Sequence, residues 1–509
     1  MAIDKKFGAF LKKQRKNNGL SQYQLGKLLG VSDRAVSKWE NGLSKPSTKL
    51  LARISEIFCL SIDELLETGI SQEKAAKKEL LNARKNLWGT LDKRLFDRYG
   101  SFPAIEVISR YEKEKIILSD TDMPEYFNLL SLLKAEAVKN QSKIKLISGV
   151  GASFVAYLYG ITDINPLAPH YYCPKCRSTE FISDVRDGWD LPYKTCPCCH
   201  VAMKRDGHNI PFEVYRHVIH SKAGFDVIIN QSFYKQAEQF LIDNLRNHSI
   251  LVWKRRREPC YGESESDFST FVIQPIEKKR YVKKDDTVLA DDTYSEILSI
   301  YPYINLLFDD TFEKITRLEQ ITNRSCERLD FLDNKTVFDS LTNDLANRAD
   351  NLSFQSVAKK FEIKSFDHLI HAVGMGMLEQ EYPGSMETMY GNLSSMNDAI
   401  VFRDDLFNLI CSKLREHGCY DSEIAYTITN QARKGIYHRY GVDLITQKLL
   451  MDIGFSDDFI KFLKSVPYLF NEATGILYLE KKLATTWFRI FYPNEYMITF
   501  QESHNNPDV

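Results

Sequence analysis

Two Cys-x-x-Cys pairs, separated by nineteen residues, constrain the fold of this 509-residue chain more than any other feature. Each pair places two thiolates on one tight turn, and two such turns complete a tetrahedral set of sulfur ligands around Zn²⁺. Four sulfur ligands leave no open coordination position, so we expect a structural zinc ion rather than a catalytic one. The expected ligands are Cys173, Cys176, Cys196 and Cys199.

The other cysteines and histidines of this region are expected to play no part in the metal site. Five of the ten cysteines fall within residues 173–199, which is typical of a metal site in a reducing compartment and not of a disulfide framework. Cys198 does not fit the pattern and is expected to be a free thiol, while His200 and His208 are substitute ligands that the site does not need. The alternative is that the four paired thiols are unrelated.

The N-terminal sequence predicts a cytoplasmic protein without a membrane partner. The first ten residues, MAIDKKFGAF, have no apolar signal core. The longest nearly apolar run, residues 146–161, is shorter than the roughly 20 residues needed to span a bilayer.

Residues 1–66 differ in charge from the rest of the chain. They carry 12 Lys or Arg and 6 Asp or Glu, whereas the whole chain has a net charge of −1. A basic segment attached to a mildly acidic body indicates that the segment, and not the body as a whole, meets nucleic acid.

The local pattern within residues 1–66 predicts two short helices joined by a glycine turn. Ser21 is a favourable N-cap with Gln24 placed to close a capping box, and Gly30 follows this helix as the turn residue. Ser32 caps the next helix, which is expected to end at Gly42.

Such a pair is a helix-turn-helix, and its second helix enters the major groove of DNA. The alternative is a small helical bundle with a solvated basic face. We expect Ala35, Val36 and Trp39 to face the core, and Gln22 to touch a phosphate. The predicted DNA-binding residues are Gln22, Ser32, Asp33, Arg34, Ser37 and Lys38.

The stretch GLSQYQLGKLLGVSDRAVSKWENG, followed by Pro46, Leu50 and SIDELL, closely resembles the XRE (Cro/repressor-like) family. The resemblance covers residues 4–66. It implies a five-helix, lambda-repressor-like domain that binds double-stranded operator DNA, usually as a homodimer on a palindrome.

The remainder of the chain carries a second resemblance. The segments VGASFVAYLYGITDINPLAPHYYCPKCRSTEF, GWDLPYKTCPCC and KRDGHNIPFE resemble the PolC-type DNA polymerase III alpha subunit. The resemblance is strong over residues 148–213 and fainter through FDVIINQSF, FRDDLF and ARKGIYHRYG. It implies a zinc-binding segment beside a polymerase palm, between a phosphate-binding Gly-Ser loop and the catalytic aspartates.

The chain departs from this family at the positions that carry its chemistry. Two-metal phosphoryl transfer needs several converging carboxylates. The Asp-x-Asp pair of the family is matched by Asp226 and Ile228, and its third aspartate falls in a gap around residues 306–308. The triphosphate loop is reduced to LISGVGASF, where Ile147 replaces an arginine and Ser148 and Gly149 are transposed. The Lys-Ala-His element is also missing, within residues 469–473.

We therefore expect no catalytic residues, close helix packing at the glycines of residues 149–151, and a multidomain, mainly α protein with α+β parts. The predicted segments are a helix-turn-helix domain at 1–68, a helical connector and degenerate loop at 69–160, a four-cysteine zinc-binding module at 161–215, and a degenerate, mostly helical palm and fingers region at 216–509. The predicted function is a sequence-specific transcriptional regulator whose inactive body binds a partner, such as a replication or phage protein. Two alternatives stay open, namely a replisome decoy in defence or a mobile element, and a live polymerase or nucleotidyltransferase.

Overall fold

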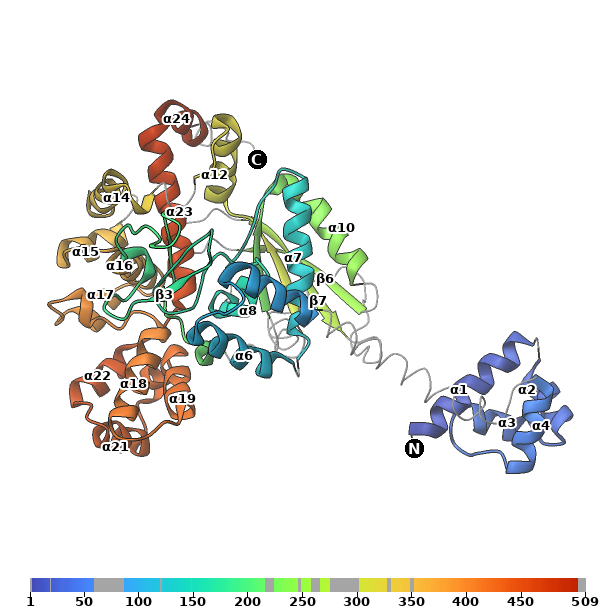
Figure 1. Cartoon of the computed structure of the whole chain (residues 1–509). Helices are drawn as coiled ribbons and strands as arrows, with labels where there is room; N and C mark the ends of the chain where they lie inside the picture. The colour runs from blue at the N-terminus through green and yellow to red at the C-terminus, as the bar shows by residue number, and fades with distance from the viewer. Residues whose placement is uncertain are drawn as a thin grey trace. The chain divides into compact units, whose positions relative to one another are not determined.

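The chain forms two compact units, Met1–Thr90 and Leu91–Val509, which are described separately (Figure 1). The finer boundaries expected within the second unit stay predictions. The computed structural model describes residues 2–18, 20–58, 87–119, 121–147, 149–215, 224–245, 249–257, 266–274, 302–326, 331–347 and 352–501. The SIDELL stretch of the expected five-helix domain, at residues 61–66, lies outside the described residues.

The first unit contains the predicted pair of short helices. Ser21 closes the expected capping box with Gln24, and Gly30 ends the first helix of the pair in the left-handed conformation. The Ser32 side chain accepts a hydrogen bond from the Ala35 backbone and caps the second helix. The caps therefore follow the sequence prediction. Within residues 2–58 of this unit, the described helices are α1 (Ala2–Asn17), α2 (Gln22–Leu29), α3 (Asp33–Glu40) and α4 (Thr48–Phe58).

A buried ion pair closes the core of this unit. Val36 and Trp39 of α3 pack against α1, α2 and α4, as predicted. Beside them Arg15 of α1 donates to both carboxylate oxygens of Glu40 at 2.5 and 3.1 Å, and to the Leu20 carbonyl at 2.6 Å. The pair ties the end of α1 to the end of α3.

The second unit is built on a five-stranded mixed sheet with the order β1-β5-β8-β7-β6. The central strands β5 and β8 are parallel, and the other neighbouring strands are antiparallel. In this register Asp226 lies opposite Asn305 and Ile228 lies opposite Leu307. The strands are β1 (Ile144–Leu146), β5 (Gly224–Ile229), β6 (Ser249–Arg257), β7 (Ser266–Gln274) and β8 (Tyr303–Leu307).

The two faces of this sheet meet different helices. On one face Phe225 packs against Tyr126 and Phe127 of α7 (Met123–Lys139), which itself contacts α10 (Tyr234–Asn244). Alternate residues of a strand point to opposite faces, so Asp226 and Ile228 face the other way. There they meet α12 (Asp310–Thr322), which packs against α23 (Glu472–Phe491).

A three-stranded antiparallel sheet with the order β3-β2-β4 supports the cysteine pairs. Around the two sheets the body is mostly helical, as the sequence predicts (Figure 1). Its short strands are β2 (His170–Tyr172), β3 (Thr179–Phe181) and β4 (Lys204–Asp206). Its further helices are α6 (Ile105–Ser119), α8 (Phe154–Leu158), α14 (Lys335–Asn347), α15 (Leu352–Lys360), α16 (Phe366–Glu381), α17 (Ser385–Tyr390), α18 (Arg403–Glu416), α19 (Ser422–Arg433), α20 (Ile436–Tyr440), α21 (Leu444–Asp452), α22 (Asp457–Ser465) and α24 (Pro493–Gln501).

Replacing Arg15 by Met should destabilise the first unit by about 3 kcal/mol, because it leaves the buried Glu40 carboxylate without its cation. Hydrogen exchange of the full chain, followed by mass spectrometry, should show faster exchange in peptides from α1 to α4 and unchanged exchange in the body. The matched control is Lys13→Met on the exposed side of α1. Equal exchange in the two variants would contradict the role given to this ion pair.

Candidate functional site

The predicted recognition helix α3 presents its polar edge to solvent. Arg34 and Lys38 are exposed and Ser37 is half-buried, while Val36 and Trp39 are buried on the opposite side. Asp33 accepts a hydrogen bond from the Arg34 backbone, which supports the first turn of the helix. Helix α3 therefore has one side in the core and one polar side exposed to solvent, as a helix that enters the major groove requires.

Gln22 has a partner that the sequence does not reveal. Its amide nitrogen donates to Glu40 Oε2 at 2.8 Å, so the side chain is fixed to the same carboxylate that Arg15 binds. Gln22 stands at the start of α2 and is half-buried. Its contact with a phosphate stays a prediction, and Glu40 is the residue that would orient it.

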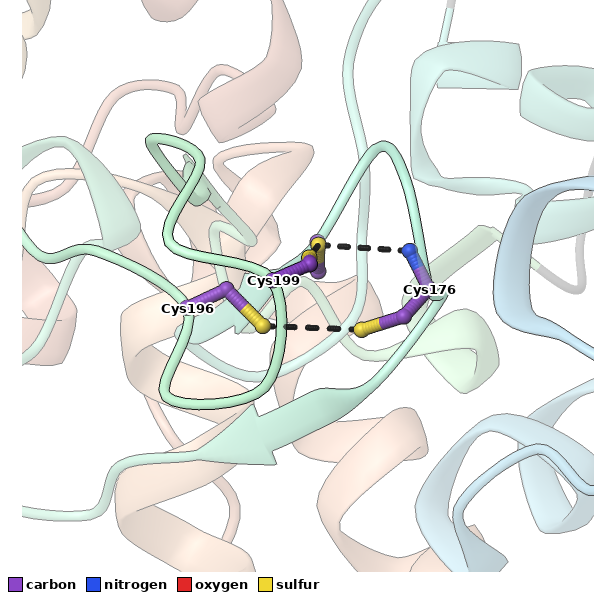
Figure 2. Close-up of side chains that lie close together, drawn as sticks. Cys176, Cys196 and Cys199 are labelled. Atoms are coloured by element: carbon purple, nitrogen blue, oxygen red, sulfur yellow. Dashed lines mark hydrogen bonds between the residues drawn. The ribbon is translucent and has the colours of Figure 1, made fainter.

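The four paired cysteines converge, as Figure 2 shows for Cys176, Cys196 and Cys199. One sulfur from each pair meets one from the other, with 3.2 Å between Cys173 and Cys199 and 3.5 Å between Cys176 and Cys196. All four sulfur atoms lie within 4.8 Å of one another. Within the described ranges they are the only group of three or more His, Cys, Asp or Glu side chains placed to hold a metal ion.

The neighbouring candidates for this metal site lie apart from it. Cys198 is exposed and outside the group, as expected. His208 is buried and its Nδ1 is 2.6 Å from Asp187 Oδ2, which leaves it engaged elsewhere. The four thiols therefore form the candidate metal-binding group that the spacing predicts.

The hydrogen bonds around these thiols favour ionisation of some and not of others. Desolvation disfavours the Cys196 thiolate, but backbone N–H groups of Cys199 and Cys198 lower the pKa of this thiol to about 5. The hydrogen bond with Cys173 raises the pKa of Cys199 to about 12. A bound metal would need all four thiolates, so its binding should release protons and weaken as the pH falls.

An apolar cluster lies beside Asp226 on the same face of the large sheet. Ile228, Leu307 and Phe312 form one buried cluster, and Ile147 packs against it. Ile228 stands at the position matched to the second Asp-x-Asp carboxylate, and Ile147 stands at the position matched to the loop arginine. These two positions therefore lie in contact, and both hold isoleucine. Asp226 itself is half-buried, and Asn305 donates to its Oδ1 at 2.6 Å.

Asn305 lies beside Asp226 on the neighbouring strand. The expected gap at the third carboxylate of the family, around residues 306–308, stays a prediction, and β8 pairs in register with β5 up to Leu307. The polar residue that β8 presents beside Asp226 is the amide of Asn305. An amide offers one oxygen and no charge, so it adds nothing to the electrostatic attraction of a divalent cation.

The next carboxylate along the chain after β8, that of Asp309, has a structural role. Asp309 is buried and accepts a hydrogen bond from the Phe312 backbone at 2.7 Å, which caps α12. Its second oxygen accepts from Lys481 of α23. The pair fixes α12 against α23 on this face of the sheet.

The glycines of the reduced loop serve close packing, as expected. A Cβ added to Gly149 would lie 2.9 Å from Arg403 Nη2, and one added to Gly151 would lie 2.8 Å from the Ala473 Cβ. Both distances are shorter than side-chain packing allows. The loop therefore packs under α18 and the start of α23. Ser148, which takes part in the apparent transposition, lies outside the described residues.

A carboxylate of the chain itself occupies the helix start that follows this loop. Glu114 of α6 is fully buried and accepts hydrogen bonds from the backbone of Phe154 at 2.9 Å and Val155 at 3.0 Å. It also accepts from the Ser153 hydroxyl at 2.8 Å, and Arg110 balances its charge at 2.5 Å. Nothing in the local sequence identifies Glu114, because its partners lie about 40 residues away.

Comparisons with known proteins agree with this division of the chain. Residues 11–65 match a family model described as helix-turn-helix. DNA polymerase III PolC-type from Caldanaerobacter subterraneus subsp. tengcongensis is 24% identical over 416 residues, which cover 69% of this chain and 29% of that protein. The same protein from Ureaplasma parvum is 23% identical over 468 residues, or 79% of this chain and 32% of that protein. The one from Bacillus subtilis is 56% identical over 68 residues, which cover 13% of this chain and 5% of that protein.

The chain spans about a third of the length of these curated relatives. It carries an XRE-type helix-turn-helix domain at residues 11–65, and homology to PolC-type DNA polymerase III extends over most of the rest. The first part indicates DNA binding, and the second is a polymerase-related body. Within the described part of the chain, no helix is long and apolar enough to cross a membrane.

Purified protein should contain about one metal ion per chain, and Cys176→Ser should lose most of it, because three sulfur ligands bind far more weakly than four. Elemental analysis measures the metal content, and thermal unfolding should show a lower Tm for the variant. Cys198→Ser is the matched control and should keep both metal and Tm. Full metal content in Cys176→Ser would refute the assigned ligand set.

Proposed function

We propose that this protein is a sequence-specific transcriptional regulator whose polymerase-related body binds a partner and does not synthesise DNA. The helix-turn-helix domain would bind a palindromic operator as a homodimer. The body would have two conformations, which differ in how well the attached domain binds the operator. The partner would change operator affinity by no more than the difference between its binding free energies for these two conformations. A replication protein or a nucleic-acid structure is the partner that a polymerase-shaped surface favours.

The apolar cluster around Ile228 is the observation that carries this proposal. A two-metal site stabilises the charge that develops on a transferring phosphoryl group and needs carboxylates that bridge the ions. Here Asp226 is flanked by the amide of Asn305 and by the side chain of Ile228. A cation at this place would meet one carboxylate and a hydrocarbon surface, which cannot replace its water ligands.

Glu114 supports the same proposal from a second direction. The backbone N–H groups of Phe154 and Val155 are a natural position for a phosphate oxygen, but Glu114 already accepts from them. A triphosphate would have to displace a buried carboxylate and leave Arg110 without its partner. Loss of the bridging carboxylate and occupation of the amides are independent changes, and both oppose nucleotide chemistry.

The metal that suits the cysteine cluster is Zn²⁺. Four thiolates at tetrahedral spacing select zinc over Mg²⁺ or Ca²⁺, which prefer oxygen ligands. The zinc ion would hold the two cysteine turns together beside the β3-β2-β4 sheet. A closed set of four ligands gives it a structural role.

Asp226, which the alignment retains, and Arg403 favour the rival function, a live nucleotidyltransferase. Arg403 is 5% exposed, its side chain reaches Gly149, and its Nε has no hydrogen-bond partner in the described part of the chain. A buried cation beside the reduced loop is suited to an anionic group. The rival function would still need a second carboxylate from elsewhere to complete the metal site.

Arg34→Ala should weaken binding to the operator by about 1–3 kcal/mol and relax base preference at one position, because a base contact is lost. Selection of a bound sequence from a random DNA pool, followed by fluorescence anisotropy at physiological salt, supplies the operator and the affinity. Lys448→Ala, on exposed α21 in the body, should leave the affinity unchanged. Unchanged affinity in Arg34→Ala, Ser37→Ala and Lys38→Ala alike would exclude α3 as the recognition helix.

The full chain should incorporate no nucleotide on a primed template with Mg²⁺ or Mn²⁺, because the bridging carboxylate is missing. Primer extension resolved on a sequencing gel measures this directly. Asp226→Ala is the matched variant, and it should be indistinguishable from the parent protein. Template-dependent extension by the parent that disappears in Asp226→Ala would establish the rival function.

A further inference from the structure

The body contains a cavity of about 610 Å³ between the large sheet and the cysteine-bearing segment. Its walls come from the end of α7, β1, α12, α23 and the β2–β4 pair. The volume is within the range of about 300–1,000 Å³ that is typical of small-molecule sites. The cavity is therefore large enough for an organic ligand.

The floor of this cavity is the apolar cluster around Ile228, the residue matched to the second Asp-x-Asp carboxylate. Ile228 and Phe312 are each 5% exposed, and Ile147, Ile315 and Leu477 line the cavity beside them. Such a floor contacts the apolar body of a ligand and excludes a hydrated cation. The substitution that removes a carboxylate at Ile228 thus creates hydrocarbon surface for binding.

The edge of the cavity is charged and partly open to solvent. Most of its cations already have carboxylate partners, such as Lys145, which contacts Asp163 and Glu480 at 3.1 Å. Lys481 is paired with Asp309, and Arg205 with Asp333 at 2.7 Å. These pairs hold the walls together and leave little charge for a ligand.

Arg98 forms a longer ion pair than these cations, with Asp206. Its side chain is 35% exposed, lies 4.2 Å above the Tyr157 ring and donates to the Tyr172 hydroxyl at 3.0 Å. Its nearest carboxylate, Asp206, is 3.9 Å away and already accepts from the Tyr157 hydroxyl at 2.7 Å. The Nε of Arg98 has no hydrogen-bond partner among the described residues.

Lys204 supplies a second cation at the same end of the cavity. It lies opposite Tyr172 in the antiparallel register of β2 and β4, and cross-strand neighbours have side chains on one face. Lys204 is exposed, lines the cavity and makes no ion pair within the described ranges. Arg98 and Lys204 therefore flank Tyr172 with two positive charges.

We propose that this cavity binds a small organic anion, with its acidic group between Arg98 and Lys204 and its flat apolar body on the Ile228 and Phe312 floor. The aromatic rings of Tyr157 and Tyr172 border the acidic group. A single carboxylate, sulfonate or phosphate suits two cations, whereas the apolar floor suits an aromatic or polycyclic body. This ligand would be an effector of the proposed regulator, so its role rests on the proposed function, although its binding does not.

The test uses 8-anilinonaphthalene-1-sulfonate, a fluorescent probe with an aromatic body and one acidic group, and the full metal-bound chain without DNA. We expect one saturable site per chain. Lys204→Ala and Arg98→Met should each raise the Kd about tenfold or more, because each removes a charged partner of the sulfonate. Ile228→Asp should weaken binding as well, because it places a carboxylate in the apolar floor. Lys448→Ala is the control and should not change the Kd.

Metal content and Tm of each variant establish that it is folded, and Lys204→Ala alters an exposed side chain that the fold does not need. Multiple weak sites, or a Kd that is equal in all folded variants, would overturn the proposal. Operator binding is measured separately with and without the probe. A saturable, Lys204-dependent site in a protein that binds no operator would support the cavity and refute the proposed function.

Discussion

The contact between Ile228, Leu307 and Phe312 is the interaction on which our proposal for the body depends. It joins β5, β8 and α12 in one buried apolar cluster, at the position that the sequence matches to the second carboxylate of an Asp-x-Asp pair. A buried carboxylate is stable only when a cation or several donors balance it, so an apolar floor and a two-metal site exclude each other. We propose that the surface presented here serves apolar contact and not the binding of two metal ions.

Elsewhere in the chain, buried carboxylates accept hydrogen bonds from groups that could otherwise bind water or a ligand. Glu114 accepts from backbone N–H groups at the start of α8, and Glu40 holds Arg15 and Gln22 beneath the recognition helix. In both cases a partner within the chain replaces water or ligand and fixes the geometry before any binding occurs. Preorganisation of this kind suits a DNA-binding domain, which must hold α3 rigid, and it suits the binding role that we propose for the body.

Short-range features were predictable from the sequence, and long-range contacts were not. The caps at Ser21 and Ser32, the turn at Gly30 and the convergence of the four cysteines follow from residue types at fixed spacing, and the structure confirms them. Glu114 and Glu40 could not be found in this way, because, apart from Arg110, their partners lie 18 to 41 residues away in the sequence. The role of Asn305 beside Asp226 was hidden for a related reason, because alignment without a structure cannot fix strand register.

The central claim is that the polymerase-related face of the body binds no pair of catalytic metal ions. Electron paramagnetic resonance of Mn²⁺, titrated into the full chain in the presence of a deoxynucleoside triphosphate and primed DNA, measures this most directly. The account predicts no protein-dependent site: the free Mn²⁺ signal should match that of the triphosphate and DNA alone. Two protein-dependent Mn²⁺ sites per chain that disappear in Asp226→Ala would contradict it.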